Sequence, residues 1–82
     1  MKKLMVKAFW DEEAEVWVAE SEDVPGLVTE AGTMEALISK LKVLIPELLE
    51  ANGLFGEIDD DGQIPFHLLS ERIEKIQRLG HV

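Results

Sequence analysis

The sequence predicts an α+β fold in which a small antiparallel sheet is covered by one helix. Two observations carry this prediction. Three short segments in the first 31 residues are rich in β-branched and aromatic residues that alternate between two faces, as in strands. A longer segment after them has apolar residues at helical spacing. Three strands and a helix bury enough apolar surface to be stable, so the 82 residues are expected to form a single domain, residues 1–82.

The first predicted strand, residues 2–10, alternates most clearly. One face is apolar throughout and carries Leu4, Val6, Ala8 and Trp10. The opposite face mixes lysines with Met5 and Phe9. Because a strand presents alternate residues to opposite faces, the first face is expected in the core. The second face is expected to be partly covered or to contact another subunit.

The next two strands follow through polar connections. A polar turn over residues 11–14 leads into the second strand, residues 15–20, and the two strands form an antiparallel hairpin. An acidic loop then ends in Pro25-Gly26, a structural turn in which proline fixes φ and glycine permits a positive φ. The third strand is expected over residues 27–31.

A helix is predicted over residues 34–51. Thr33 is placed to cap its first N–H groups, and Glu35 lies in the first turn, where a negative charge complements the helix dipole. Leucines at four-residue and three-residue spacing form a wide apolar stripe, and Asn52-Gly53 is a stop signal. Pro46 lies inside this helix, where it removes one backbone hydrogen bond and is expected to produce a kink.

The last segment, residues 63–78, is ambiguous. Its apolar residues have helical spacing, which slightly favours a helix: Phe66, Leu69, Ile73, Ile76 and Leu79. Residues 64–69 are equally typical of a strand entering a sheet. Periodicity alone does not decide between the two.

The net charge of −9 is the most informative bulk property. An acidic surface repels the phosphate backbone, so direct binding of nucleic acid is not expected. It attracts basic partners, although charge that serves only solubility is the simpler alternative. The chain contains no cysteine, no apolar run of bilayer length and no signal-peptide pattern, so a cytoplasmic protein without a membrane association is expected.

The acidic hairpin and the loop after it are the candidate binding site. Their carboxylates could pair with Arg or Lys of a basic partner, with Trp17 as an aromatic anchor. The alternative is that the acids are solvated turn residues and that Trp17 packs under the helix or on a sister subunit. The candidate partner-binding residues are Asp11, Glu12, Glu13, Trp17, Glu20, Glu22 and Asp23.

Other motifs do not support a catalytic or metal site. Asp59-Asp60-Asp61-Gly62 invites a calcium interpretation, but neither register supplies both the glycine and the final glutamate of an EF-hand loop. His67 and His81 form no metal-binding pair and no catalytic triad pattern. No carboxylate cluster suits two-metal hydrolysis. No cofactor, metal or enzyme activity is therefore expected, and a residual hydrolase is the weakest of the hypotheses.

Several of these stretches together resemble the HicB-like antitoxin domain, in a compact, stand-alone branch known as a domain of unknown function. The resemblance covers roughly residues 6–74 and is most specific between residues 10 and 27. The matching stretches are Trp10-Asp11-Glu12-Glu13, Val16-Trp17-Val18-Ala19, Asp23-Val24-Pro25-Gly26-Leu27, Thr29-Glu30-Ala31, Leu37-Ile38-Ser39-Lys40-Leu41, Ile45-Pro46-Glu47-Leu48-Leu49 and Ile64-Pro65-Phe66.

The resemblance implies a β-β-β-α-β order, which is HicB-like and double-stranded-RNA-binding-like. A three-stranded antiparallel sheet is followed by one packed helix and then a final strand. On this basis residues 63–76 are assigned as a strand, and a proline at position 46 is a habit of the family.

The resemblance also implies a function. Related HicB proteins bind and neutralise HicA, a small basic ribonuclease toxin, so an antitoxin-type interaction protein that masks such a toxin is expected. The alternative is a stand-alone homo-oligomeric structural or regulatory domain without a toxin, and a homodimer or higher homo-oligomer is expected in either case. Many HicB proteins add a DNA-binding domain for which 82 residues leave no room, which puts autoregulation by this chain in doubt.

Overall fold

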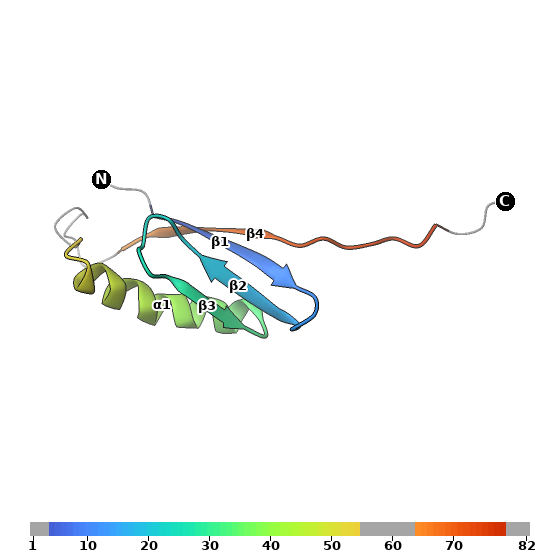
Figure 1. Ribbon diagram of the computed structural model, residues 1–82, viewed down its shortest axis with the longest axis horizontal. Helices are drawn as coiled ribbons and strands as arrows, with labels where there is room; N and C mark the ends of the chain where they lie inside the picture. The colour runs from blue at the N-terminus through green and yellow to red at the C-terminus, as the bar shows by residue number, and fades with distance from the viewer. Residues whose placement is uncertain (1–3, 55–63, 79–82) are drawn as a thin grey trace.

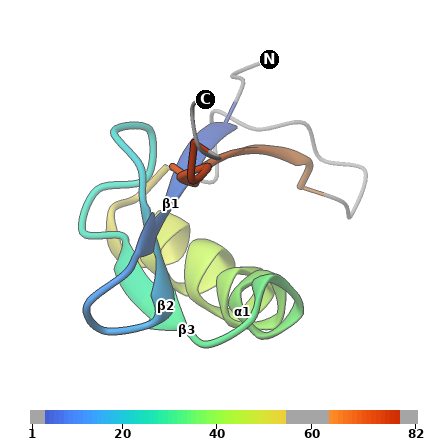
Figure 2. The same ribbon diagram turned by 90° about the vertical axis from the view of Figure 1, so that its right-hand side faces the viewer.

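The chain folds into a four-stranded sheet with one helix lying across one of its faces (Figures 1 and 2). The computed structural model describes residues 4–54 and 64–78. Its elements in chain order are β1 (Leu4–Asp11), β2 (Val16–Glu20), β3 (Val28–Ala31), α1 (Met34–Ala51) and β4 (Phe66–Glu71). The predicted α+β class and β-β-β-α-β order are confirmed.

The sheet has the strand order β3-β2-β1-β4. β1 pairs antiparallel with β2, and β2 pairs antiparallel with β3, as the hairpin pattern predicts. β4 lies on the other side of β1 and is parallel to it, with Leu4 opposite Phe66 and Phe9 opposite Glu71. The sheet is therefore mixed, and its two edges are β3 and β4.

The last segment is a strand and not a helix. β4 spans six residues, shorter than the strand expected over residues 63–76, and residues 72–78 continue as extended chain. Within β4, Phe66 and Leu68 are half-buried while the residues between and after them are exposed. This period of two matches the pleat of a sheet, and pairing with β1 satisfies the backbone groups that a helix would have satisfied internally. The helical spacing of its apolar residues was misleading.

The core lies between α1 and the inner face of the sheet. The buried alanines Ala19 and Ala31 lie on β2 and β3, the strands that α1 contacts, and their small side chains leave space for the helix to approach. The buried hydrophobic residues are Leu4, Val6, Ala8, Ala19, Val24, Leu27, Ala31, Leu37, Leu41, Ile45 and Leu49. The β1 face predicted to be apolar thus supplies three of them, and the i, i+4 stripe of α1 supplies four.

Both ends of α1 are capped. The Thr33 side chain accepts a hydrogen bond from the Ala36 N–H at 3.1 Å. At the other end the Leu54 N–H donates to the Leu49 carbonyl at 2.9 Å, and the Gly53 N–H donates to the Glu50 carbonyl at 3.1 Å. Gly53 has φ +67°, so these two bonds form the Schellman arrangement that ends many helices. The helix continues through Pro46 and ends where the Asn-Gly signal predicted.

Among the residues that the structure describes, no helix combines the length and the apolar character that crossing a bilayer needs.

Candidate functional site: the open face of the sheet

The sheet face that points away from α1 is called the open face. The strand register places on it Met5, Lys7, Phe9, Val18, Glu20, Val28, Glu30, His67, Leu69 and Glu71. Three large apolar side chains on this face are exposed: Phe9, Val28 at 71 % and Leu69 at 52 %. The β1 alternation predicted that this side would carry both lysine and apolar residues. An exposed face that mixes apolar and charged side chains has the composition of an interaction surface.

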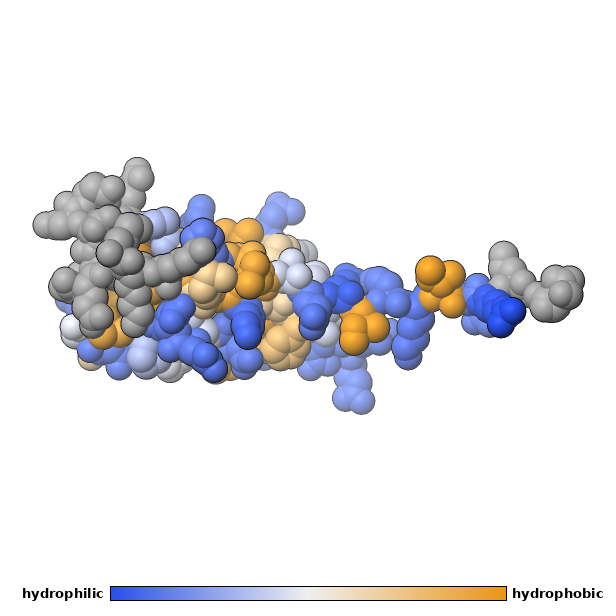
Figure 3. Space-filling model, turned by 90° about the horizontal axis from the view of Figure 1, so that it is seen from above, coloured by the Kyte–Doolittle hydropathy of each residue, from blue (hydrophilic) through white to orange (hydrophobic). Residues whose placement is uncertain are grey.

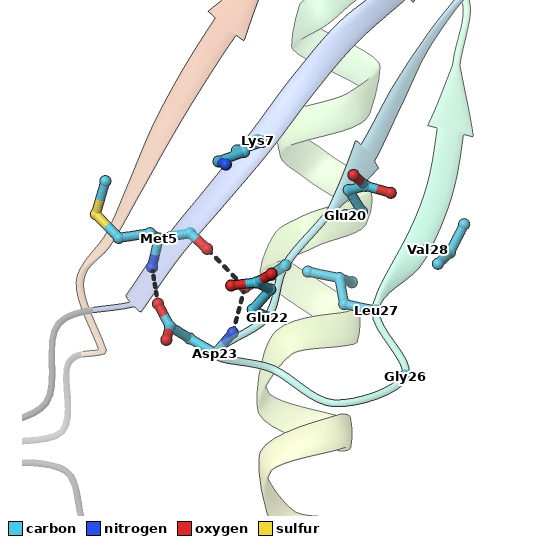
Figure 4. A pocket seen from close by; sticks show the side chains of 9 residues that line it. Met5, Lys7, Glu20, Glu22, Asp23, Gly26, Leu27 and Val28 are labelled. Atoms are coloured by element: carbon cyan, nitrogen blue, oxygen red, sulfur yellow. Dashed lines mark hydrogen bonds between the residues drawn. The ribbon is translucent and has the colours of Figure 1, made fainter.

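A groove of about 530 Å³ lies on the open face, where it meets the loop between β2 and β3 (Figure 4). Apolar lining comes from Met5, Leu27 and Val28. The charged lining comes from Glu20, Glu22, Asp23 and one base, Lys7, which lies directly opposite Glu20 on the neighbouring strand. A second hollow, of about 340 Å³, continues from Lys7 and Glu20 toward Phe9 and Leu69. Together they make the open face a shallow, acidic and partly apolar surface.

The wall of the groove is fixed by Ser21 and Asp23, which bind the backbone of β1 (Figure 4). The Met5 N–H donates to Asp23 Oδ2 at 2.8 Å, and the Ser21 hydroxyl donates to the Met5 carbonyl at 2.6 Å. Ser21 Oγ also accepts from the N–H groups of Asp23 and Val24, at 3.1 and 3.3 Å. On the β2 side of Met5 these two side chains thus take the place of a paired strand, while β4 pairs with Met5 on its other side. The carboxylate of Asp23 is committed to the fold.

The loop then turns at Pro25-Gly26. The Leu27 N–H donates to the Val24 carbonyl at 3.1 Å, and Gly26 has φ +86°. Proline before a glycine of positive φ is the pattern of a type II turn. Asn52 joins this turn to the end of α1, because its side-chain amide donates to the carbonyls of Pro25 and Leu48 at 3.2 and 2.8 Å. The groove loop is therefore anchored on both the sheet and the helix.

Replacing Gly26 by alanine is expected to lower the free energy of unfolding by about 1–2 kcal/mol, because a side chain destabilises a left-handed backbone. The added Cβ would meet Leu48 Cδ2 at an ordinary 3.6 Å, so the cost is conformational and not steric. Gly32→Ala is the matched control, since nothing lies within 4 Å of the added Cβ and its φ is outside the left-handed region. Urea denaturation followed by tryptophan fluorescence measures both. If Gly26→Ala and Gly32→Ala lowered the free energy of unfolding equally, the left-handed backbone of Gly26 would not be the reason for the loss.

The acidic turn between β1 and β2 lies at the other end of the hairpin. The side chain of Asp11 accepts hydrogen bonds from the N–H groups of Glu13 and Ala14, at 3.1 and 3.2 Å, so this carboxylate stabilises the turn. Glu15 carries the turn's positive φ of 54°. Glu12 and Glu13 are exposed. β2 rises about 3.3 Å per residue, so its length from Val16 to Glu20 separates this turn from the groove by about 13 Å. The structure does not bring the two acidic clusters together.

Trp17 lies on the helix side of the sheet, away from the groove. It is half-buried against the core, and its ring makes an edge-to-face contact with Trp10, with centroids 5.4 Å apart and planes at 63°. The guanidinium of Arg72 lies 4.3 Å from the centroid of the Trp10 ring. Trp17 thus packs on the helix side of the sheet, which was the alternative to its being an anchor for a partner.

Of the predicted partner-binding residues, only Glu20, Glu22 and Asp23 line the groove. Sequence reasoning did not single out Ser21, Val28 or Leu69. A loop serine often accepts a hydrogen bond from the backbone N–H two or three residues further on, and this tendency could have identified Ser21. Val28 and Leu69 could have been placed only from the strand register.

No group of three or more potential metal ligands gathers in residues 4–54 and 64–78. His67 is exposed on the open face, opposite Met5. The acidic motif at residues 59–62 and His81 lie outside the described residues.

The chain is similar to a known family over most of its length. A domain of unknown function, DUF1902, matches residues 3–78. The chain belongs to the DUF1902 family. Among solved structures, this DUF1902 chain is similar to the crystal structure of hypothetical protein TTHA1013 from the extremely thermophilic bacterium Thermus thermophilus. The two are 48% identical, with a TM-score of 0.66, over 94% of this chain and 100% of that one. No curated protein matches the chain.

Proposed function

We propose that this DUF1902 protein is a HicB-like, antitoxin-type interaction protein of the cytoplasm that binds and masks a small basic HicA-type ribonuclease toxin. It acts by covering the toxin and catalyses no reaction. The observation that supports this proposal is the open face, on which exposed apolar side chains adjoin an acidic groove. The sequence resemblance to HicB proteins supplies the identity of the partner.

The open face has the two parts that a protein interface needs. Phe9, Val28 and Leu69 offer apolar area that a partner can desolvate. Glu20 and Glu22 lie at the groove with exposed carboxylates, which attract a basic partner and raise its association rate. Of the candidate residues, these two are the acids best placed to pair with Arg or Lys. Asp11 and Asp23 instead hold the loops, Trp17 supports the sheet from beneath, and Glu12 and Glu13 could form only a separate contact.

The test is to co-express the chain with the product of the neighbouring open reading frame, and to measure growth rescue and the dissociation constant of the purified complex. Glu20→Gln together with Glu22→Gln is expected to raise that constant about tenfold at low salt, because exposed ion pairs contribute up to about 1 kcal/mol each. The effect should shrink as salt rises.

The matched control is Glu35→Gln together with Glu47→Gln, which removes the same net charge from exposed positions on α1. This control should leave affinity nearly unchanged. If both double variants weaken binding equally, only net charge matters and the groove is not the binding surface. Absence of both binding and growth rescue would overturn the proposal itself.

The exposed apolar residues of the open face also favour a second candidate, a homo-oligomeric structural or regulatory domain without a toxin. Light scattering that shows a salt-insensitive oligomer, together with no effect on growth of the neighbouring gene product, would favour this candidate.

A further inference from the structure

Residues 72–78 form an arm that projects from the body of the molecule (Figure 1). The molecule is 62 Å long but only 23 and 19 Å in its other dimensions. All seven side chains of the arm are exposed, including Ile73 at 79 % and Ile76 at 95 %. Seen from above, the arm is a narrow and mostly hydrophilic projection interrupted by apolar patches (Figure 3). These two large aliphatic side chains offer apolar area that the surface of another molecule can bury.

The arm is basic, although the protein is strongly acidic. It holds three of the eight bases, Arg72, Lys75 and Arg78, and one acid, Glu74. The other 75 residues therefore hold five bases and sixteen acids, for a net charge of −11. The arm and the body thus carry opposite charge, and the acids that line the groove are a fitting counterpart.

The arm is directed away from its own groove. It leaves the sheet after Glu71, which lies opposite Phe9, whereas the groove is at the other end of β1, beside Met5. Where the arm leaves the sheet, Arg72 contacts the Trp10 ring and pairs with Glu74. Between residues 72 and 78 there is no Gly, Pro, Asn or Asp to favour a reversal. Binding to the groove of another molecule requires no such turn.

We propose that the arm of one molecule docks in the acidic groove of a second copy. In an extended chain, Ile73 and Lys75 point to one side, and Ile76 and Arg78 to the other. Beyond Arg72 and Glu74, which pair with each other, each side thus has one isoleucine and one base. The groove offers the complementary pair, with Met5 and Val28 as apolar contacts and Glu20 and Glu22 as acids.

Reciprocal exchange closes the assembly. The arm and the groove lie at opposite ends of β1, so two copies in antiparallel orientation place each arm beside the other's groove. The same contact then forms twice about a two-fold axis, which gives a closed dimer. This self-association needs no toxin and is measured on the chain alone. A result that shows no dimer would therefore leave the proposed binding of a toxin untouched, although the arm and the toxin are both proposed to bind the groove.

The test is a charge exchange between arm and groove, read by light scattering and sedimentation equilibrium of the full chain. The first variant reverses the arm with Lys75→Glu and Arg78→Glu. The second reverses the groove with Glu20→Lys and Glu22→Lys. In each variant alone, arm and groove carry like charge, and we expect the dimer dissociation constant to rise about tenfold or more. Mixed in equal amounts, both contacts become complementary, and a heterodimer is expected.

The matched control is Lys40→Glu with Lys42→Glu, which makes the same charge change on exposed positions of α1. It should remain dimeric, and circular dichroism checks that every variant is folded. A natural chain that is monomeric would overturn the proposal. So would arm and groove variants that stay dimeric, or a mixture of the two that stays monomeric.

Discussion

Replacing Leu41 by alanine is expected to lower the free energy of unfolding by about 3 kcal/mol, the middle of the range for buried leucines. Leu41 is fully buried at the centre of the α1 stripe, between Leu37 and Ile45. Its loss removes apolar contacts and leaves a cavity between helix and sheet. A domain of this length has roughly 4–12 kcal/mol of stability in total. The substitution therefore removes a large part of it, and the shift is measured by urea denaturation with tryptophan fluorescence.

Val43→Ala is the control for Leu41→Ala. Val43 lies on the same helix but is 59% exposed. Its truncation should change the free energy of unfolding by less than about 0.5 kcal/mol. If the two variants lost similar stability, the orientation of α1 against the sheet would be wrong.

Asp23→Ala is expected to cost about 2 kcal/mol of stability, because the half-buried Met5 N–H loses a charged acceptor at 2.8 Å. The exchange rate of the Met5 amide should rise more than those of the other β1 amides, which nuclear magnetic resonance can measure. Asp23→Asn keeps an acceptor oxygen in the same place and should recover part of the loss. Protection of the Met5 amide that is unchanged in Asp23→Ala would contradict this role.

The neighbouring Glu22→Ala is the control for this substitution. Glu22 is exposed and adjoins the same groove, so its truncation should change stability by less than about 0.5 kcal/mol. The comparison of Asp23→Ala with Glu22→Ala also helps to interpret the binding experiments. Loss of partner binding in an Asp23 variant would follow from a displaced loop, whereas Glu22 and Glu20 report on charge.

Local signals in the sequence were sufficient for most of the fold. Thr33 and Asn52-Gly53 mark the two ends of α1, and the structure places the helix over the predicted residues. The alternation of β1 separated the buried face from the open face correctly. These features depend on side chains a few residues apart, so the chain itself displays them.

Features that depend on distant residues were not predictable in this way. The apolar spacing from Phe66 to Ile76 has a helical period, and only the family resemblance indicated a strand. That this strand lies parallel to β1 is set by the packing of the whole sheet. Prediction of the candidate site from the sequence was incomplete for the same reason. Asp23 resembles any loop acid in the sequence, and its bond to Met5, 18 positions away, exists only in the folded chain.

The position of β4 has a consequence for the order in which the protein can fold during synthesis. Among the described strands, β1 comes first in the chain and β4 last, yet β1 lies inside the sheet with β4 as one of its two neighbours. Until Glu71 has left the ribosome, one side of β1 has unpaired N–H and C=O groups, which is the hazard of an exposed strand edge. The hairpin and α1 can assemble earlier from contacts that are closer in sequence. A nascent chain halted before Phe66 would therefore be a partly formed, aggregation-prone species.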